Sequence, residues 1–139
     1  RVAIGLMELF RVVQKRALAR SRRFTPPVSI GELARGVDGI VFVADSAPEK
    51  VQANIQAWRD MEKHLTSYKL SIGQTPVVLQ CNKQDLLGAL ALGEMRSVLR
   101  VQDMASYPAV AMKGEGVLET LKAITRNVIT QVQHQTAVA

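Results

Sequence analysis

Hydrophobic residues along this chain form short apolar runs that alternate with stretches of helical spacing. Residues 36–46 carry an unbroken apolar centre, which is typical of a buried parallel strand. Ser46 and Glu49 form a capping-box pattern directly after it, which predicts the start of a helix. The apolar stripe of this helix is expected to comprise Val51, Ile55, Trp58, Met61 and Leu65. The pattern therefore predicts a strand followed by a helix that lies on a sheet.

The same alternation continues towards the end of the chain. Residues 76–81 predict a second buried strand, Leu92–Leu99 a shorter helix, and residues 107–112 a third strand. A last helix is expected to begin near Val117, with a buried stripe that stops short of a polar tail at residues 133–135. Its predicted buried stripe comprises Val117, Leu121, Ile124, Val128 and Val132. Strands that alternate with helices predict an α/β fold with a mostly parallel sheet, flanking helices and right-handed crossovers.

Positive charge is concentrated at the start of the chain. Residues 1–35 contain eight Lys or Arg and two acids, which accounts for the whole net charge of +6, and residues 36–139 are balanced. The basic residues between 11 and 23 could form one face of a helix with apolar residues opposite. Three interpretations are open, namely a solvated face over a packing stripe, a membrane-surface anchor, or a nucleic-acid patch. We favour the first, because aromatics and glycines that would accompany base stacking are absent there.

Residues that commonly serve in catalysis and metal binding are sparse. Cys81 is the sole cysteine, so an intramolecular disulfide is excluded, and a buried strand position indicates a reduced thiol in the cytoplasm. His64 and His134 lie on separate helical segments and predict neither a metal cluster nor a hydrolase triad. An apolar run of about 20 residues and a secretory leader are both missing, so we expect neither a spanning helix nor export. We assign no catalytic residue and no metal ligand.

The strongest candidate for chemistry is Asn82-Lys83-Gln84-Asp85, directly after the predicted strand at residues 76–81. A carboxylate at a strand end, here Asp85, can accept hydrogen bonds from two edge donors of guanine, while the stem of Lys83 lies along the base. Adenine offers no such donor pair, so the arrangement would discriminate between purines. A structural alternative is that Asp85 caps the following turn and Asn82 ties neighbouring loops.

These phrases together resemble the Ras-like small GTPases, and within them the bacterial MglA-type branch concerned with gliding motility and cell polarity. The resemblance spans residues 36–133 and rests on residues 36–46, residues 82–86 and the phrase at residues 109–117. It implies a three-layer, P-loop-GTPase-like fold. It also implies that a backbone N–H near Ala111 meets the guanine carbonyl oxygen, so the expected guanine-binding residues are Asn82, Lys83, Asp85, Ala111 and Met112.

One expected part of that family is missing from these residues. The phosphate-binding pattern Gly-x-x-x-x-Gly-Lys-Ser/Thr does not occur, and Thr25-Pro26-Pro27 has Pro27 where the branch carries glycine. With only the base held, GTP or GDP is expected to bind weakly, and magnesium is not expected from this chain alone. We therefore expect residues 1–35 to be a basic, helical segment and residues 36–139 the C-terminal portion of a GTPase-like domain whose N-terminal part is incomplete or remodelled.

The missing part also affects the sheet and the partners. The strand near residues 39–44 lacks an evident neighbour, which residues 2–10 could supply as a strand or cover as a helix, or which a second copy could supply. We favour the helix. The resemblance implies a roadblock-type activator or polarity effectors as partners, and an exposed sheet edge allows a homodimer. An anionic membrane surface is a further candidate partner, whereas nucleic acid is not expected.

Three functions follow from these observations. The first is a degenerate GTPase that keeps its guanine-recognition loops and acts as a partner-binding module in cell polarity or motility. The second is a genuine GTP-binding switch with GTPase activity, whose phosphate-binding segment lies outside these residues. The third is a basic adaptor at the membrane surface.

Overall fold

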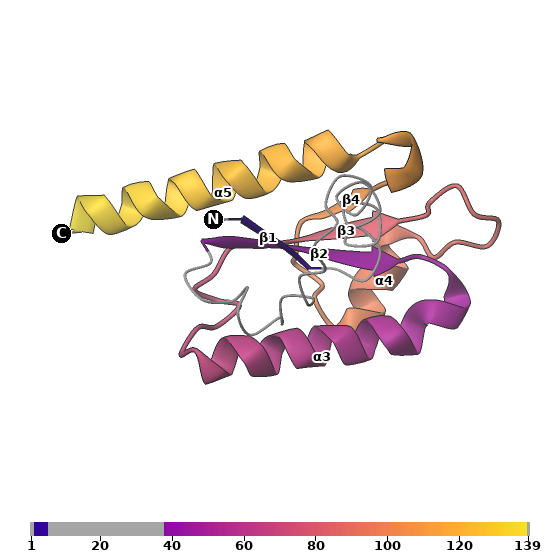
Figure 1. The fold of residues 1–139 in the computed structure, drawn as a ribbon, viewed down its shortest axis with the longest axis horizontal. Coiled ribbons are helices and arrows are strands. Elements are labelled where there is room, and N and C mark those ends of the chain that lie inside the picture. Colours follow the sequence, from indigo (N-terminus) through magenta and orange to yellow (C-terminus); the bar gives the residue numbers. More distant parts are fainter. Residues whose placement is uncertain (1, 6–37, 139) are drawn as a thin grey trace, which may run out of the picture.

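The computed structural model describes residues 2–5 and 38–138, which form an α/β arrangement (Figure 1). One parallel sheet has the strand order β1-β2-β3-β4, with β1 at Val2–Gly5, β2 at Gly39–Asp45, β3 at Val77–Asn82 and β4 at Ser106–Pro108. The helices are α3 at Val51–Ser67, α4 at Leu92–Leu99 and α5 at Val117–Val138. Two 3-10 turns, η1 at Pro48–Lys50 and η2 at Ala111–Lys113, precede α3 and α5.

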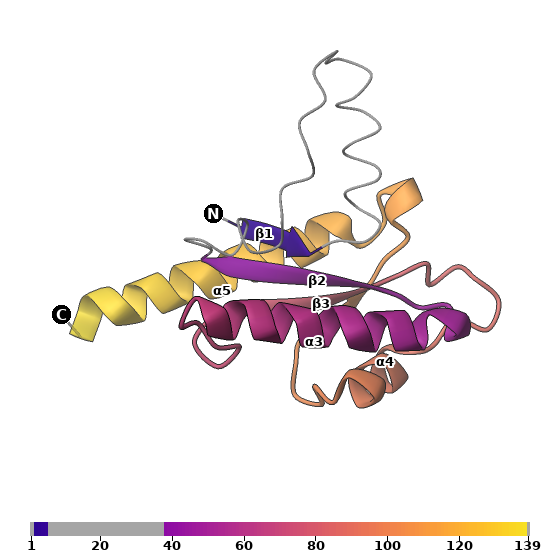
Figure 2. The same ribbon diagram turned by 60° about the horizontal axis from the view of Figure 1, so that its bottom comes forward.

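The helices lie in two layers on opposite faces of the sheet. Helices α3 and α4 share one face, and α5 lies along the other (Figures 1 and 2). Since each strand alternates its side chains between the faces, β2 supplies Ile40 and Phe42 to one layer and Val41 and Val43 to the other. The predicted three-layer α/β fold with a parallel sheet is therefore confirmed.

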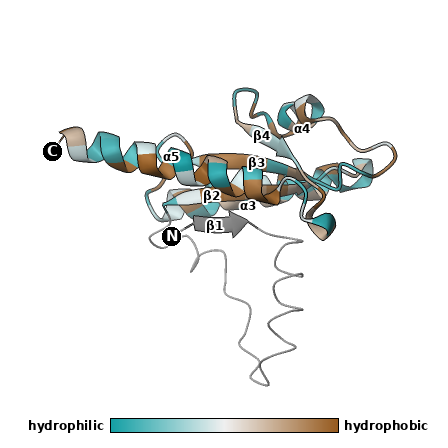
Figure 3. Ribbon diagram, turned by 90° about the horizontal axis from the view of Figure 1, so that it is seen from above, coloured by the Kyte–Doolittle hydropathy of each residue, from teal (hydrophilic) through white to brown (hydrophobic). Residues whose placement is uncertain are grey.

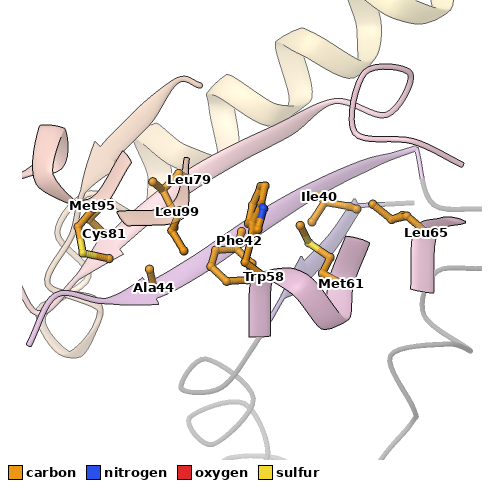
Figure 4. Packing of buried hydrophobic residues seen from close by; sticks show 10 residues of the cluster. All are labelled: Ile40, Phe42, Ala44, Trp58, Met61, Leu65, Leu79, Cys81, Met95 and Leu99. Atoms are coloured by element: carbon orange, nitrogen blue, oxygen red, sulfur yellow. The ribbon is translucent and has the colours of Figure 1, made fainter. Parts of the chain in front are cut away.

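The larger core lies between the sheet and helices α3 and α4 (Figure 4). Trp58 of α3 meets Phe42 of β2 edge-on, with ring centroids 4.9 Å apart, a geometry that aromatic pairs prefer. Ten residues from four elements make up this core, namely Ile40, Phe42, Ala44, Trp58, Met61, Leu65, Leu79, Cys81, Met95 and Leu99. The apolar stripe predicted for α3 is thus buried at Trp58, Met61 and Leu65.

The smaller core lies under α5, and here the predicted stripe is wrong in part. Ile124 is fully buried against Val41, Val43 and Val78, but Leu121 is 43% and Val132 51% exposed. Thr120 is buried in their place, because its hydroxyl donates to the Gly116 carbonyl oxygen and so needs no water. A glycine in β2 allows close approach as well, since a Cβ on Gly39 would lie 2.5 Å from Val128 Cγ2.

Two local predictions differ from the structure. Ser46 and Glu49 do not form a capping box, because η1 intervenes and Ser46 is buried, where its hydroxyl accepts a hydrogen bond from Gln84 Nε2. The strand predicted over residues 107–112 is only Ser106–Pro108, because the chain then turns into η2. The boundaries of α4 agree with the prediction residue for residue.

The edge of β2 is covered differently from our expectation. Residues Val2–Gly5 form strand β1, parallel to β2 and in register from Val2 opposite Gly39 to Gly5 opposite Phe42, and not the helix that we favoured there. A strand satisfies the row of backbone N–H and C=O groups at that edge, which a helix would leave unpaired. The basic face predicted between residues 11 and 23 and the Thr25-Pro26-Pro27 turn lie outside the described residues.

Candidate functional site

Polar side chains gather where parallel strands β2, β3 and β4 end, at one edge of the sheet. Asp45 ends β2 and Ser46 follows it, the Asn82–Asp85 phrase begins at the last residue of β3, and residues 109–116 follow β4. The carboxyl ends of parallel strands in open α/β sheets are where ligands bind, because loops rather than ladder hydrogen bonds determine that surface. These three segments therefore form the candidate site.

Asp45 connects the end of β2 to the loop after β3. Its Oδ2 lies 2.7 Å from Lys83 Nζ, and its Oδ1 accepts from the Ala47 N–H at 3.0 Å. Asn54 of α3 holds the backbone of the same residue, donating to the Asp45 carbonyl oxygen at 2.7 Å and accepting from its N–H at 3.1 Å. Lys83 itself has a φ of +63°, a left-handed conformation that is uncommon outside glycine. The ion pair therefore holds the lysine at a strained turn.

Gln84 closes the loop after β3 upon itself. Its Nε2 donates to Ser46 Oγ at 2.7 Å and to the Leu90 carbonyl oxygen at 2.9 Å, and its backbone N–H donates to Ala109 at 3.1 Å. The Leu90 N–H in turn donates to the Ser46 carbonyl oxygen at 2.8 Å. One side chain thus ties the ends of β2 and β3 to the far end of the loop.

The loop after β4 depends on two glycines with positive φ. Gly114 and Gly116 have φ values of +78° and +73°, which side chains rarely adopt. At Gly116 a Cβ would also lie 2.0 Å from the Pro108 carbonyl oxygen, so only glycine fits. The bridge between Val110 and Glu115 closes the loop, and Thr120 bonds back to Gly116 at the start of α5.

A hydrogen bond and an ion pair join the two loops. Asn82 Oδ1 accepts from the Ala111 N–H at 2.9 Å, and both groups lie at the base of the loops. Farther out, Asp85 Oδ2 lies 3.9 Å from Lys113 Nζ, with 41% of the Asp85 side chain and 59% of the Lys113 side chain exposed. The structure thus brings the predicted residues Asn82, Ala111 and Asp85 into one assembly, in which the carboxylate of Asp85 faces solvent.

Sequence reasoning missed the residues that hold this assembly. The sequence pattern assigns Ser46 to a helix cap and gives Asp45 and Gln84 no role in a site, yet these three make the contacts that position the loop. The adjacency of β2 and β3 was the available signal, since Asp45 pairs with Asn82 in the ladder and so lies beside the base-reading phrase. Asn54 gave no signal, because a buried polar residue on a helix stripe is usually structural.

Other kinds of site find little support in the part of the chain that the structure describes. Within residues 2–5 and 38–138, there is no cluster of three or more His, Cys, Asp or Glu side chains that could hold a metal ion. None of the helices there is long and apolar enough to cross a membrane. Cys81 is buried, and that burial raises the pKa of its thiol from 9.0 to about 12 although Arg96 opposes the shift, which argues against a nucleophile.

A hollow of about 500 Å³ lies near the amino ends of β2 and β3, between residues 70–75 and the C-terminal half of α5. Its lining is mainly Gln and aliphatic side chains, with Asp38 as the charged residue. It lies far along the fold from the polar loops. We therefore place the candidate chemistry at the carboxyl ends of the strands and not in the hollow.

The chain is similar in sequence to several known proteins. Residues 32–128 match the model of the ADP-ribosylation factor family. "Mutual gliding-motility protein MglA" of Myxococcus xanthus is 39% identical over 101 residues, which cover 73% of this chain and 52% of the relative. "ADP-ribosylation factor-like protein 4A" of Homo sapiens is 33% identical over 96 residues, 65% of this chain and 46% of the relative. The chain thus spans about half the length of the curated relatives it matches.

Proposed function

Because the chain belongs to the ADP-ribosylation factor family of small GTPases, whose members generally bind GTP or GDP, we propose that its carboxyl-edge loops recognise the guanine base. The observation that carries the proposal is the coupling of the loops after β3 and β4 through Asn82 and Ala111, which leaves the Asp85 carboxylate exposed beside Lys113. A carboxylate in that position accepts from the two edge donors of guanine, whereas adenine presents one amino donor beside a ring acceptor, which repels the carboxylate.

Each residue has a distinct role in the proposal. Asp85 accepts from the base, and the stem of Lys83, whose ammonium is held by Asp45, covers one face of it. The Ala111 N–H already donates to Asn82 Oδ1, so Ala111 and Asn82 hold the two loops together. The guanine carbonyl oxygen then falls to the next N–H along, that of Met112, whose side chain is 86% exposed and can rest against the base.

The affinity for a nucleotide is low when only its base is bound. A charge-assisted hydrogen bond contributes about 1.5–3 kcal/mol before the costs of ordering the ligand. Two such bonds from Asp85 are too few for tight binding without phosphate contacts. Since the phosphate-binding pattern does not occur in these 139 residues, we propose weak nucleotide binding without hydrolysis.

The biological role that we propose is that of a partner-binding module in cell polarity or motility. It rests on the 39% identity with a relative that is named as a mutual gliding-motility protein. A roadblock-type activator or a polarity effector is the partner that the resemblance suggests. In this role the guanine loops persist as a preformed surface, and GTPase chemistry is dispensable.

A second candidate is a genuine GTP-dependent switch. It is favoured by one specific observation, namely that the chain covers 52% of the MglA relative, so a longer protein could carry the phosphate-binding segment. The base-recognition residues would be the same in both cases. The two candidates differ in phosphate contacts and in hydrolysis.

Thermal unfolding with added nucleotides tests the base-recognition proposal. We expect GTP and GDP to raise the melting temperature of the chain and ATP to have no effect, because ligands that bind only the folded state stabilise it by mass action. Asp85→Ala should abolish the shift. Asp103→Ala is the matched control, because Asp103 is an exposed aspartate in the turn between α4 and β4, and it should retain the shift.

Indifference of the unmodified chain to all three nucleotides, or equal shifts with ATP, would refute base recognition. Phosphate release from GTP separates the two candidates when it is measured on a longer protein that contains these residues, because the switch needs a phosphate-binding segment outside them. We expect no release above that of buffer, whereas release that disappears in Asp85→Ala would establish the switch instead.

A further inference from the structure

Helix α5 carries a second apolar stripe beside the one that it buries. Its side chains are about half exposed, namely Leu118 at 55%, Leu121 at 43%, Ile129 at 52% and Val132 at 51%. Figure 3 shows that hydrophobic and hydrophilic segments alternate along α5 when the molecule is seen from above. Single exposed apolar residues are ordinary, but four on one side of one helix form a contiguous patch that usually marks an interaction site.

The spacing of this stripe is symmetric about Thr125. Leu118 and Val132 lie seven residues before and after it, and Leu121 and Ile129 lie four residues before and after it. Thr125 itself is exposed. At 3.6 residues per turn all five positions fall on one side of the helix, between the buried stripe and the charged side. A pattern that reads the same in both directions matches an inverted copy of itself.

We propose that the α5 stripe pairs with the same stripe of a second copy of this chain, antiparallel and around a two-fold axis at Thr125. In such an isologous contact residue i meets residue j and residue j meets residue i. Leu118 then packs against Val132 of the second copy, Leu121 against Ile129, and Thr125 against itself. This surface differs from the sheet edge, where β1 now pairs with β2.

The charges of α5 favour the antiparallel direction. Glu119, Lys122 and Arg126 all lie in the first half of the helix, and residues 127–138 contain no Asp, Glu, Lys or Arg. Antiparallel pairing places Lys122 at the level of residue 128 of the second copy, in the half of α5 that carries no Asp, Glu, Lys or Arg. A parallel pair would instead bring the two Lys122 side chains together, and like charges repel.

The size of the stripe determines the strength of the dimer. Stable interfaces bury about 1,200–2,000 Å² in total, and four half-exposed side chains from each copy fall short of that range. The dimer is therefore concentration-dependent. Val132 also lines the hollow described above, so the Leu118 side chain of the second copy packs at its rim.

Disulfide trapping tests the two-fold position. Helices that pack at about 8–10 Å, each with a Cα radius of about 2.3 Å, place two facing Cα atoms about 3–5 Å apart, which overlaps the range that a disulfide requires. Oxidised Thr125→Cys should therefore form a covalent dimer. Thr130→Cys is the matched control, since Thr130 is also exposed but lies on another side of α5, and it should stay monomeric under denaturing conditions.

Sedimentation across a concentration series tests the residue pairs. The unmodified chain should rise from 15.2 kDa towards twice that mass, and Leu121→Glu should weaken association about a hundredfold, because the change enters the symmetric contact twice. Mixing Leu121→Glu with Ile129→Lys should restore the dimer, since one contact becomes an ion pair and the other stays apolar. Mixing Leu121→Glu with Val132→Lys should not restore it.

Three results would overturn the proposal. The first is a chain that remains monomeric at every concentration, which is expected if another partner or a further segment covers the stripe. The second is equal crosslinking of Thr125→Cys and Thr130→Cys. The third is equal rescue of Leu121→Glu by Ile129→Lys and by Val132→Lys. Unchanged far-ultraviolet circular dichroism in each variant shows that a lost dimer is not a lost fold.

Discussion

Individual polar side chains in the candidate site make several contacts each. Gln84 uses its backbone and its amide nitrogen, and Asp45 uses both carboxylate oxygens. The resemblance predicts Asn82, Lys83, Asp85, Ala111 and Met112 as guanine-binding residues, because their order carries a known pattern, and that role stays a prediction. Asp45 and Gln84 act through contacts between strands that are distant in the sequence, and no local pattern reports such contacts.

Cys81 provides a prediction at the same scale. Burial raises the pKa of its thiol from 9.0 to about 12, so between those values the unfolded chain loses a proton that the folded chain keeps. The stabilising contribution of this group is therefore complete below the unfolded pKa and is lost as the pH rises towards 12. Between about pH 8.5 and pH 10, the difference in free energy of unfolding between the unmodified chain and Cys81→Ala should shrink by about 1 kcal/mol.

Denaturant titrations of both proteins at the two pH values measure that change. The comparison with Cys81→Ala removes the contributions of lysines and tyrosines, which titrate in the same range. A difference that stays constant with pH would show that the thiol is not held neutral by the fold.

At the scale of elements, hydrophobic spacing was a reliable guide where one face of an element is buried. The bounds of α4 and the centres of β2 and β3 follow directly from apolar runs. The stripe of α5 was misplaced because the helix carries apolar residues on two adjacent sides, and periodicity alone does not reveal which side faces the sheet. Gly39 and the hydroxyl of Thr120 decide that orientation through tertiary contact.

Two leucines show that burial, and not hydrophobicity alone, determines how much a residue contributes to stability. Leu65 on α3 is 2% exposed within the larger core, whereas Leu87 in the loop after β3 is fully exposed. Leu65→Ala should lower the free energy of unfolding by about 2–5 kcal/mol, because it leaves a cavity. Leu87→Ala should change it by no more than about 0.5 kcal/mol.

Chemical denaturation of the two variants checks this directly. Both substitutions remove the same atoms, so intrinsic helix or loop preference cannot produce a difference of that size. Comparable losses from the two would mean that the loop after β3 is packed in solution.

At the scale of the whole molecule, the sheet is completed by a strand from the start of the chain. Sequence reasoning recognised that β2 needs a neighbour and named a strand at residues 2–10 among the solutions, but it favoured a helix. The four residues Val2–Gly5 are too short for periodicity to identify, and the strand exists because β2 offers a template for pairing.

Removal of β1 should therefore promote association through the sheet edge. A chain without residues 1–5 exposes the backbone groups of β2 that now pair from Gly39 to Phe42. We expect light scattering to detect species larger than a dimer, which increase with concentration. A chain without residues 136–139 is the control, because residues 136–138 are exposed at the end of α5, and it should scatter like the unmodified chain. Identical behaviour of the two truncations would indicate that β1 is not a structural strand.

The loops at the carboxyl ends of the strands are held by bonds between protein groups, between Asn82 and Ala111 and between Gln84 and each of Ser46, Leu90 and Ala109. The conformational entropy of this surface is therefore given up when the chain folds, and an arriving molecule need not supply it. Association should then occur at a rate governed by diffusion and orientation, without a slow rearrangement step.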